Sequence, residues 1–281
     1  MTVEALLSRG RQRLEAANGD ASPGARAADL EAELLLAHVL GMPRARLKSH
    51  PETPVAEPQV QLYLDLIGRR AAGEPLAYLT GAREFWSLDL TVTPAVLIPR
   101  PETELLVERA LRLVTRAEAA VADLGTGSGA VALALAHERP RWRIVATDVS
   151  ASALAVARAN AAALGVTSVE FLEGSWFEPL AGAHFDLIVS NPPYVAADDP
   201  ALVALGFEPR SALTPGTDAL ACLRTLAHGA AAHLAPRGWL LLEHGAAQGE
   251  AVRGELVAAG FAHVRSHRDL AGHERMTEGQ R

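Results

Sequence analysis

The chain has 281 residues, of which 49% are hydrophobic and 21% are charged, a composition that excludes disordered and collagen-like proteins. Its 26 basic and 33 acidic residues give a formal net charge of −7. A protein that binds nucleic acid over most of its surface is usually basic, so this charge argues against that class. The single cysteine, Cys222, excludes a disulfide framework and a zinc site built from several thiolates.

The amino-terminal segment lacks the character of a signal peptide. Glu4, Arg9, Arg11 and Arg13 interrupt its apolar residues, whereas a signal peptide has a continuous apolar region. No charge-free apolar run approaches the ~18 residues that a membrane-spanning helix needs. We therefore expect a cytoplasmic protein that makes no contact with a membrane.

Residues 1–75 are predicted to form a small helical domain. Apolar residues recur at helical spacing over 29–41 and again over 60–73, and Gly41 and Pro43 follow the first of these stripes as stop signals. This part contains 9 basic and 10 acidic residues, so it is nearly neutral. The net charge of the remaining residues is therefore −6.

Residues 76–99 are predicted to form a β-hairpin linker. Leu88, Leu90 and Val92 alternate with polar residues, as in a strand with one buried face. Pro99 and Pro101 then stiffen the entry to a helix that begins near residue 102.

From about residue 118 to the end, short apolar and β-branched runs alternate with Ala- and Leu-rich helical stretches. Such alternation predicts an α/β domain, residues 100–281, whose mostly parallel sheet is covered by helices on both faces. The expected strands are 120–124, 143–148, 169–172, 185–190, 239–243, 261–266 and a last one near Arg275. The expected helices are 130–138, 152–163, 218–234 and 248–259.

A glycine-rich loop joins the first of these strands to its helix. It consists of Gly125, Thr126, Gly127, Ser128 and Gly129. Glycines allow a sharp turn and a close approach of the backbone to a ligand. Asp148 ends the next strand, where a carboxylate can accept hydrogen bonds from both hydroxyls of a ribose. The loop alone is compatible with a nicotinamide dinucleotide and with S-adenosylmethionine.

The tetrapeptide Asn191-Pro192-Pro193-Tyr194 follows the fourth strand, so it faces the same crevice as the glycine loop. The prolines have fixed φ and no N–H to donate. The Asn191 side-chain oxygen and the Pro192 carbonyl can therefore form a rigid pair of acceptors for a planar NH₂ group, with Tyr194 packed on its flat face. Held in this way, the nitrogen can be aimed at an electrophilic methyl group.

These motifs resemble those of the Rossmann-type S-adenosylmethionine methyltransferases that act on planar nitrogen. The segments IPRPETE, DLGTGSG, FDLIVSNPPYV and EPRSAL together resemble the peptide-chain release factor glutamine-N5 methyltransferases of the HemK type. The resemblance runs from about residue 73 to the end, and the helical front section agrees in character. Ser87, Pro215 and Ala219 stand where glycines are common in that family, which puts details of the substrate rim in doubt.

The resemblance implies a seven-stranded class I methyltransferase sheet preceded by a helical substrate-recognition domain. It implies S-adenosylmethionine as cofactor and methyl transfer to the glutamine amide of the GGQ motif in class I release factors, by a monomer without metal. The implied cofactor residues are those of the glycine loop with Asp148, Trp176 and Asn191; the implied catalytic residues are Asn191, Pro192 and Tyr194, and Pro193 joins them in binding the substrate.

Two other functions are compatible with parts of this pattern. An adenine-N6 DNA methyltransferase would use the same tetrapeptide, but it must hold duplex phosphates, and the −6 charge of the catalytic part speaks against it. A non-catalytic adaptor that binds release factors would not need the glycine loop, Asp148 and the tetrapeptide together.

Four charged residues have open roles at this point. Glu102 and Glu104 are either acids that complement a helix dipole or part of the active-site wall. Glu208 and Arg210 either order a substrate loop or form an ordinary surface pair.

Overall fold

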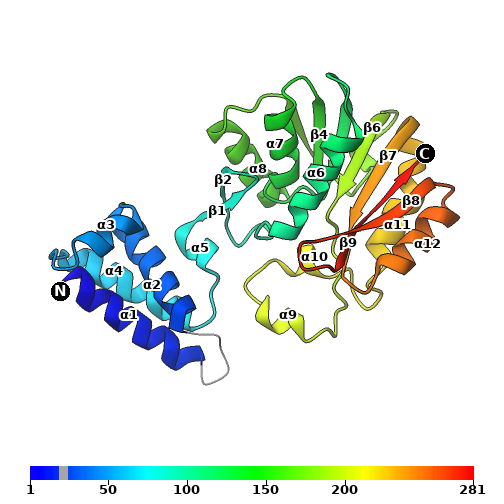
Figure 1. The fold of residues 1–281 in the computed structure, drawn as a ribbon. Helices are drawn as coiled ribbons and strands as arrows, with labels where there is room; N and C mark the ends of the chain where they lie inside the picture. Colours follow the sequence, from blue (N-terminus) through cyan, green and yellow to red (C-terminus); the bar gives the residue numbers. More distant parts are fainter. Residues whose placement is uncertain (19–24) are drawn as a thin grey trace. The chain divides into compact units, whose positions relative to one another are not determined.

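The computed structural model describes residues 1–18 and 25–281, and the chain divides into two compact units, Met1–Gly81 and Ala82–Arg281 (Figure 1). Unit 1 is helical. Its described elements are α1 (Val3–Asn18), α2 (Ala25–Leu40), α3 (Arg44–Ser49), α4 (Glu57–Ala71) and α5 (Leu76–Thr80). Their apolar faces meet around Leu6, Leu35, Tyr63 and Ile67, which are completely buried. The apolar stripes of the sequence therefore mark the inner faces of α2 and α4.

The first part of the predicted linker is helical, which corrects the interpretation of residues 76–99 as hairpin alone. Pro75 precedes α5, Tyr78 and Leu79 are buried, and the helix ends at Gly81 with φ 71°. A proline before a helix and a glycine in the left-handed conformation after it are the usual boundary residues. The division between the units thus follows Gly81 rather than residue 75.

Unit 2 begins with a two-stranded hairpin, β1 (Ala82–Phe85) and β2 (Leu88–Thr91). Phe85 pairs with Leu88, so Trp86 and Ser87 form a two-residue loop. Their φ angles of 52° and 58° are both left-handed. This is the backbone of a type I′ turn, whose twist matches that of the flanking strands.

The remaining strands of unit 2 form one seven-stranded sheet in the order β5-β4-β3-β6-β7-β9-β8. All pairs from β5 to β7 are parallel, and β9 is antiparallel to both β7 and β8. This confirms the predicted mostly parallel sheet. The strands are β3 (Ala120–Leu124), β4 (Arg143–Asp148), β5 (Val169–Glu173), β6 (Phe185–Ser190), β7 (Leu234–Glu243), β8 (Ala262–Arg268) and β9 (Glu274–Gln280).

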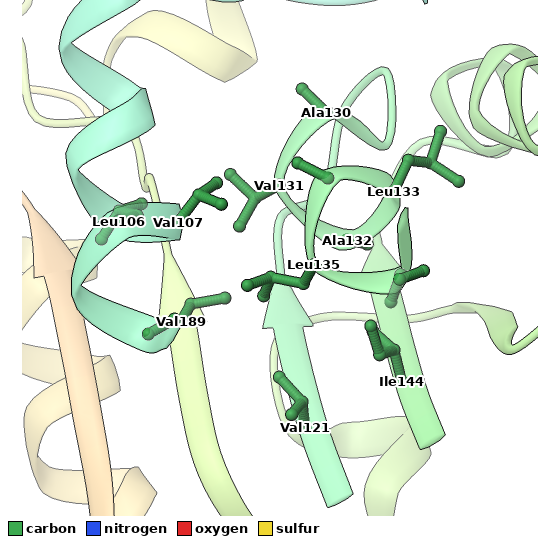
Figure 2. Packing of buried hydrophobic residues seen from close by; sticks show 14 of the residues in the cluster. Leu106, Val107, Val121, Ala130, Val131, Ala132, Leu133, Leu135, Ile144 and Val189 are labelled. Carbon is green, nitrogen blue, oxygen red and sulfur yellow. The ribbon is translucent and has the colours of Figure 1, made fainter. Parts of the chain in front are cut away.

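Helices cover both faces of the sheet because the central strands are apolar on both sides. On one face, Val121 and Val189 pack under Leu106, Val131 and Leu135 (Figure 2). The opposite face belongs to a second apolar cluster. The helices of unit 2 are η2 (Pro101–Thr103), α6 (Glu104–Leu113), α7 (Ala130–Glu138), α8 (Ala151–Ala163), η3 (Glu178–Leu180), α9 (Ala201–Ala204), α10 (Arg210–Leu213), α11 (Ala221–His233) and α12 (Gly249–Ala258).

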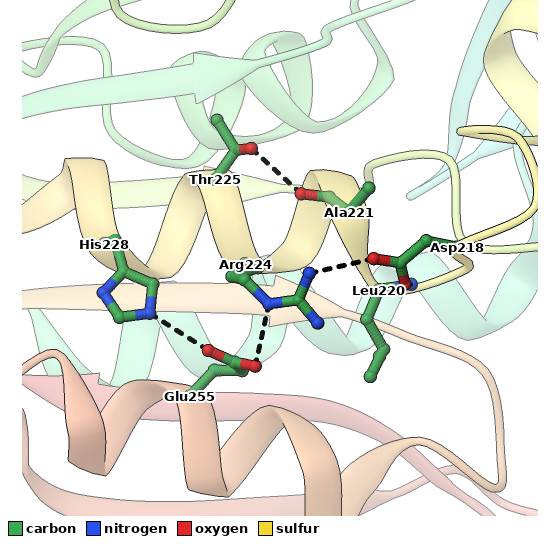
Figure 3. A network of polar contacts seen from close by, with 7 residues as sticks. All are labelled: Asp218, Leu220, Ala221, Arg224, Thr225, His228 and Glu255. Atoms are coloured by element: carbon green, nitrogen blue, oxygen red, sulfur yellow. Dashed lines mark hydrogen bonds and ion pairs between the residues drawn. The ribbon is translucent and has the colours of Figure 1, made fainter.

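A polar network joins α11 to α12 on the second face (Figure 3). Arg224 contacts Glu255 through Nε at 3.0 Å and Asp218 through Nη1 at 2.9 Å. His228 Nε2 lies 3.0 Å from the other oxygen of Glu255. These side chains are largely exposed, so the network adds little beyond the apolar contacts beneath it.

We predict that Ser87→Gly stabilises unit 2. Serine at φ 58° is strained, whereas glycine adopts this conformation freely. After the larger entropy loss of glycine on folding is subtracted, we expect the free energy of unfolding to rise by about 0.5 kcal/mol. All four tryptophans of the chain lie in unit 2, so urea unfolding followed by tryptophan fluorescence reports on this unit.

Ser152→Gly is the matched control, because Ser152 is exposed within α8. Glycine costs up to about 1 kcal/mol in a helix, so this variant should be less stable than the parent. Equal destabilisation by both substitutions would contradict a strained turn.

Candidate active site

The glycine loop and the Asn-Pro-Pro-Tyr tetrapeptide lie side by side at the point where the strand order reverses. From β3 the chain builds β4 and β5 on one side and then returns to place β6 on the other side. Leu124 pairs with Ser190, and Ser190 Oγ donates a hydrogen bond of 2.6 Å to the Leu124 carbonyl. The two motifs therefore begin next to each other, where open α/β sheets bind ligands.

A cavity of about 540 Å³ opens between these loops, and its wall also includes residues 94–97, Ser150, Gly174, Pro209, Ser211, Thr214 and Cys222. Of the predicted cofactor residues, Gly125, Gly127, Asp148, Trp176 and Asn191 line it. Thr126, Ser128 and Gly129 lie behind the lining. The structure thus brings five of the eight to one cavity and gives the other three supporting contacts.

The three glycines of the loop have φ angles of 73°, 57° and 83°, all in the left-handed region. A Cβ on Gly125 would lie 3.3 Å from the indole ring of Trp176, and one on Gly129 would lie 3.2 Å from Cβ of Ala157 in α8. Glycine at 125 therefore lets an aromatic side chain approach the loop. Glycine at 129 lets α8 pack against the start of α7.

Asp148 holds the turn of the loop from the end of β4. Its Oδ2 accepts a hydrogen bond from the Gly127 N–H, and its Oδ1 accepts one from the Ser150 N–H, both at 2.9 Å. An ionised carboxylate has about four acceptor positions. Two of them are left for further donors in the cavity.

Two residues that the sequence reasoning missed support the loop from below. Asp123 accepts from the Thr126 hydroxyl at 2.6 Å and from the Ala132 N–H at 3.2 Å. Burial raises the pKa of its carboxyl to about 6. Asn160 donates to the Ser128 carbonyl at 2.9 Å and exchanges two hydrogen bonds with the backbone of Thr91. Asn160 therefore ties the loop to the hairpin.

The tetrapeptide does not present all its side chains to the cavity. Asn191 and Pro193 line it, and Pro192 is buried. Tyr194 does not line it: its ring packs against the apolar cluster beneath α11 and α12, and its hydroxyl donates to Glu243 Oε1 at 3.2 Å. The stacking surface that we predicted for Tyr194 is thus occupied by the core in this structure.

Glu243, at the end of β7, is the central acid behind the tetrapeptide and has an exposed fraction of only 2%. Burial raises the pKa of its carboxyl to about 7, and the hydroxyls of Thr103 and Tyr194 partly oppose this rise. Asn191 Nδ2 in turn donates to Thr103 Oγ1 at 3.2 Å. Neither Thr103 nor Glu243 could be singled out from the sequence, because the residues that each of them contacts lie far away in the chain.

Three of the four charged residues with open roles, Glu104, Glu208 and Arg210, now have partners. Glu104 accepts a hydrogen bond of 2.9 Å from the Trp86 N–H and so caps the hairpin turn. Glu208 pairs with Arg100 and accepts from the Ile98 N–H at 3.0 Å. Arg210 is not the partner of Glu208; its guanidinium donates to the Ala197 carbonyl at 3.4 Å. Glu208 therefore fastens the segment after the tetrapeptide to the segment before α6.

Glu102 lies in a smaller cavity of about 340 Å³ together with Glu104, outside the lining of the main cavity. Among residues 1–18 and 25–281, no group of three or more His, Cys, Asp or Glu side chains could hold a metal ion. Within the same residues, no helix has the length and apolar character required to span a bilayer.

The sheet, with its single antiparallel strand β9 and its glycine loop after β3, is the class I S-adenosylmethionine-dependent methyltransferase fold. A methyltransferase from Pyrococcus furiosus matches with a TM-score of 0.54 at 19% identity, over 76% of this chain and 96% of that chain. A T. thermophilus 16S rRNA methyltransferase in complex with AdoMet and guanosine also gives a TM-score of 0.54 at 19% identity, over 71% of this chain and 49% of that one.

Sequence comparison narrows this class. The PrmC N-terminal domain model matches residues 5–81, and the methyltransferase small domain model matches residues 101–207. The release factor glutamine methyltransferase of Xylella fastidiosa (strain Temecula1) is 52% identical over 89% of this chain and 92% of its own length. That of Vibrio cholerae is 45% identical over 100% of this chain and 97% of its own. The chain belongs to the release factor glutamine methyltransferase family.

We predict that Glu243→Gln stabilises unit 2 at neutral pH. The pKa of the carboxyl rises from 4.5 to about 7 on folding, so the folded state binds this proton more tightly than the unfolded state. The wild-type free energy of unfolding therefore falls as the pH rises from about 5 to 7 and is level above. Glutamine does not titrate, so the variant is free of this loss. The difference in free energy of unfolding between the variant and the wild type should therefore grow by about 2 kcal/mol from pH 5 to pH 7.

Urea unfolding at pH 5, 6, 7 and 8, followed by tryptophan fluorescence, measures this difference. Glu255→Gln is the control, because the pKa of Glu255 is shifted in the opposite direction: hydrogen bonds from His228 and Arg224 lower it. That variant should not gain stability as the pH rises. A pH-independent difference between Glu243→Gln and the wild type would contradict the raised pKa.

Proposed function

We propose that this chain transfers a methyl group from S-adenosylmethionine to the side-chain amide nitrogen of the glutamine in the GGQ motif of class I release factors. The observation that carries the proposal is the position of Asn191 on the wall of the cavity formed by the glycine loop. Membership of the family supports it, with relatives of that name at 45% and 52% identity over most of their length.

The residues of the cavity fit S-adenosylmethionine, which supplies a methyl group on a positively charged sulfur. The loop backbone at Gly125 and Gly127 has no Cβ to fill the space of the methionine part. Asp148 keeps two free acceptor positions for the ribose hydroxyls. Trp176, whose ring lies against Gly125, would flank the adenine.

The substrate amide would be held by Asn191 and Pro192. Because Asn191 Nδ2 already donates to Thr103, its Oδ1 is left to accept one N–H of the substrate, and the Pro192 carbonyl can accept the other. Two acceptors polarise the amide and fix its lone pair in line with the methyl group. Bound S-adenosylmethionine would supply the methyl group, and the amide nitrogen held by Asn191 and Pro192 would accept it and then release a proton.

We assign recognition of the release factor to the helical unit, Met1–Gly81, and the chemistry to the second unit. All described residues that line the cavity come from Ala82–Arg281, and we propose that the enzyme acts as a monomer. An adenine-N6 DNA methyltransferase is not favoured, since the relatives are named for release factor glutamine and the catalytic part is acidic. The proposed reaction takes place in the cytoplasm, where release factors act.

The purified protein, incubated with S-adenosylmethionine labelled in the methyl group, should label a class I release factor and leave adenine-containing DNA unlabelled. A release factor with glutamate in place of the GGQ glutamine is the control and should remain unlabelled, because it offers no NH₂ group. Label on the DNA, or undiminished label on the glutamate variant, would contradict the assignment.

Asn191→Ala and Asn160→Ala should affect different quantities, turnover in the first variant and cofactor binding in the second. Asn191→Ala should keep the dissociation constant for S-adenosylmethionine within about threefold and lower kcat by about 100-fold or more, as when a positioned hydrogen bond is lost. Asn160→Ala loosens the glycine loop from the hairpin, so it should mainly weaken cofactor binding. Calorimetry measures the dissociation constant for S-adenosylmethionine, and methylation of the release factor measures kcat. An equal loss of cofactor binding and kcat in Asn191→Ala would mean that Asn191 binds the cofactor only.

A further inference from the structure

A buried carboxylate, Glu243, has no part in the reaction as described so far. It stands at the carboxyl end of β7, and β7 pairs in parallel with β6 up to Ser190 and Leu242. Glu243 therefore lies one strand away from the start of the tetrapeptide. A carboxylate with 2% exposure is unusual in a protein interior, because removal of the charge from water costs free energy unless other groups compensate.

The partners of Glu243 lie at the two ends of the tetrapeptide, since Tyr194 is its last residue and Thr103 contacts Asn191, its first. Tyr194, the last residue of the tetrapeptide, donates its hydroxyl to Oε1 at 3.2 Å. Thr103 belongs to the Pro-Glu-Thr-Glu segment before α6, and a hydrogen bond from its hydroxyl partly opposes the rise in the pKa of the Glu243 carboxyl. Thr103 is itself buried, with an exposed fraction of 5%. Oε2 of Glu243 is also buried and has no hydrogen-bond partner of its own among the described residues.

The Thr103 hydroxyl connects this carboxylate to Asn191. A hydroxyl has one proton to donate and can accept at its oxygen. When its proton points toward the carboxylate, its lone pairs face Asn191, whose Nδ2 donates to Thr103 Oγ1 at 3.2 Å. The opposite orientation of the Asn191 amide would bring Oδ1 against those lone pairs. A Thr103 proton directed at the carboxylate therefore favours the orientation in which Asn191 Nδ2 faces Thr103 and Oδ1 is left free.

We propose that Glu243 is a positioning residue that, through Thr103, turns the Asn191 carbonyl oxygen toward the substrate amide and, through Tyr194, holds the other end of the tetrapeptide. One acid thus aligns both ends of the motif. The proposal rests on the proposed function, since it concerns how the substrate NH₂ is gripped.

This arrangement gives the segment IPRPETE a role beside the tetrapeptide. Its threonine, Thr103, connects Glu243 to Asn191. Its arginine, Arg100, pairs with Glu208. Glu208 also binds the Ile98 N–H. The segment is thus fastened to Glu208, in the part of the chain that follows the tetrapeptide, and through Thr103 to Asn191 of the tetrapeptide itself.

The test uses Thr103→Val and Glu243→Gln in the full-length protein, because valine keeps the shape of threonine and glutamine keeps that of glutamate. Each should lower kcat for release factor methylation by about 10-fold or more, the effect of losing a hydrogen bond to a charged group. The dissociation constant for S-adenosylmethionine should stay within about twofold. Thr103→Ser keeps the hydroxyl and should retain at least about a third of the wild-type kcat.

The double variant, Thr103→Val with Glu243→Gln, distinguishes two explanations: both residues act on Asn191 along one path, or each substitution causes a separate defect. Because both residues act on Asn191 through the same hydroxyl, the double variant should lose little more than the worse single variant. Thr225→Val and Glu255→Gln are matched controls on the surface of α11 and α12 and should match the wild type in kcat.

Three results would overturn the proposal: unchanged kcat in Thr103→Val and Glu243→Gln, a parallel loss of cofactor binding, or fully additive losses in the double variant. Failure of the proposed function has a different signature, because the wild type would then label another acceptor instead of the release factor. The same variants measured on that acceptor still decide whether Glu243 positions Asn191. A rise in stability of Glu243→Gln together with a fall in kcat would show that the acid is kept for catalysis at the expense of stability.

Discussion

The parallel pairing of β3 with β6 is the constraint on which the site depends. It joins two segments that are 66 residues apart, and the Ser190 hydroxyl reinforces it at the last pair. Because the strands run in the same direction, the loops that follow them leave the sheet at the same edge. A shift of this register by one residue would turn Asn191 from the cavity into the core, since side chains alternate along a strand.

The polar groups beneath the cavity are arranged in two sets, and each contains a buried acid. Asp123 supports the glycine loop through Thr126, and Glu243 supports the tetrapeptide through Tyr194. Burial raises the pKa of both acids, to about 6 and about 7. Near neutral pH both sites therefore work against the stability of the unit that they organise, and the apolar clusters on the two faces of the sheet offset this cost.

Much of the fold could be predicted from local sequence. The strands 120–124, 143–148 and 185–190 and the helix 130–138 have the predicted bounds, because apolar runs and the glycines between them are local signals. Residues 76–80 were misinterpreted, since five residues show too little periodicity to reveal a helix. Thr103, Asn160 and Glu243 could not be found for another reason: the hydrogen-bond partners of their side chains lie 32 residues away or more, and no local pattern encodes such a contact.

The division of the chain after Gly81 has a consequence for how such an enzyme can change. The hairpin belongs to the catalytic unit, and Asn160 fastens it to the glycine loop. Every residue of the cavity wall is therefore encoded downstream of the boundary. A recombination event at this boundary would exchange the helical unit without replacing any described group that lines the cavity, so that the partner recognition we propose for that unit and the chemistry can diversify separately.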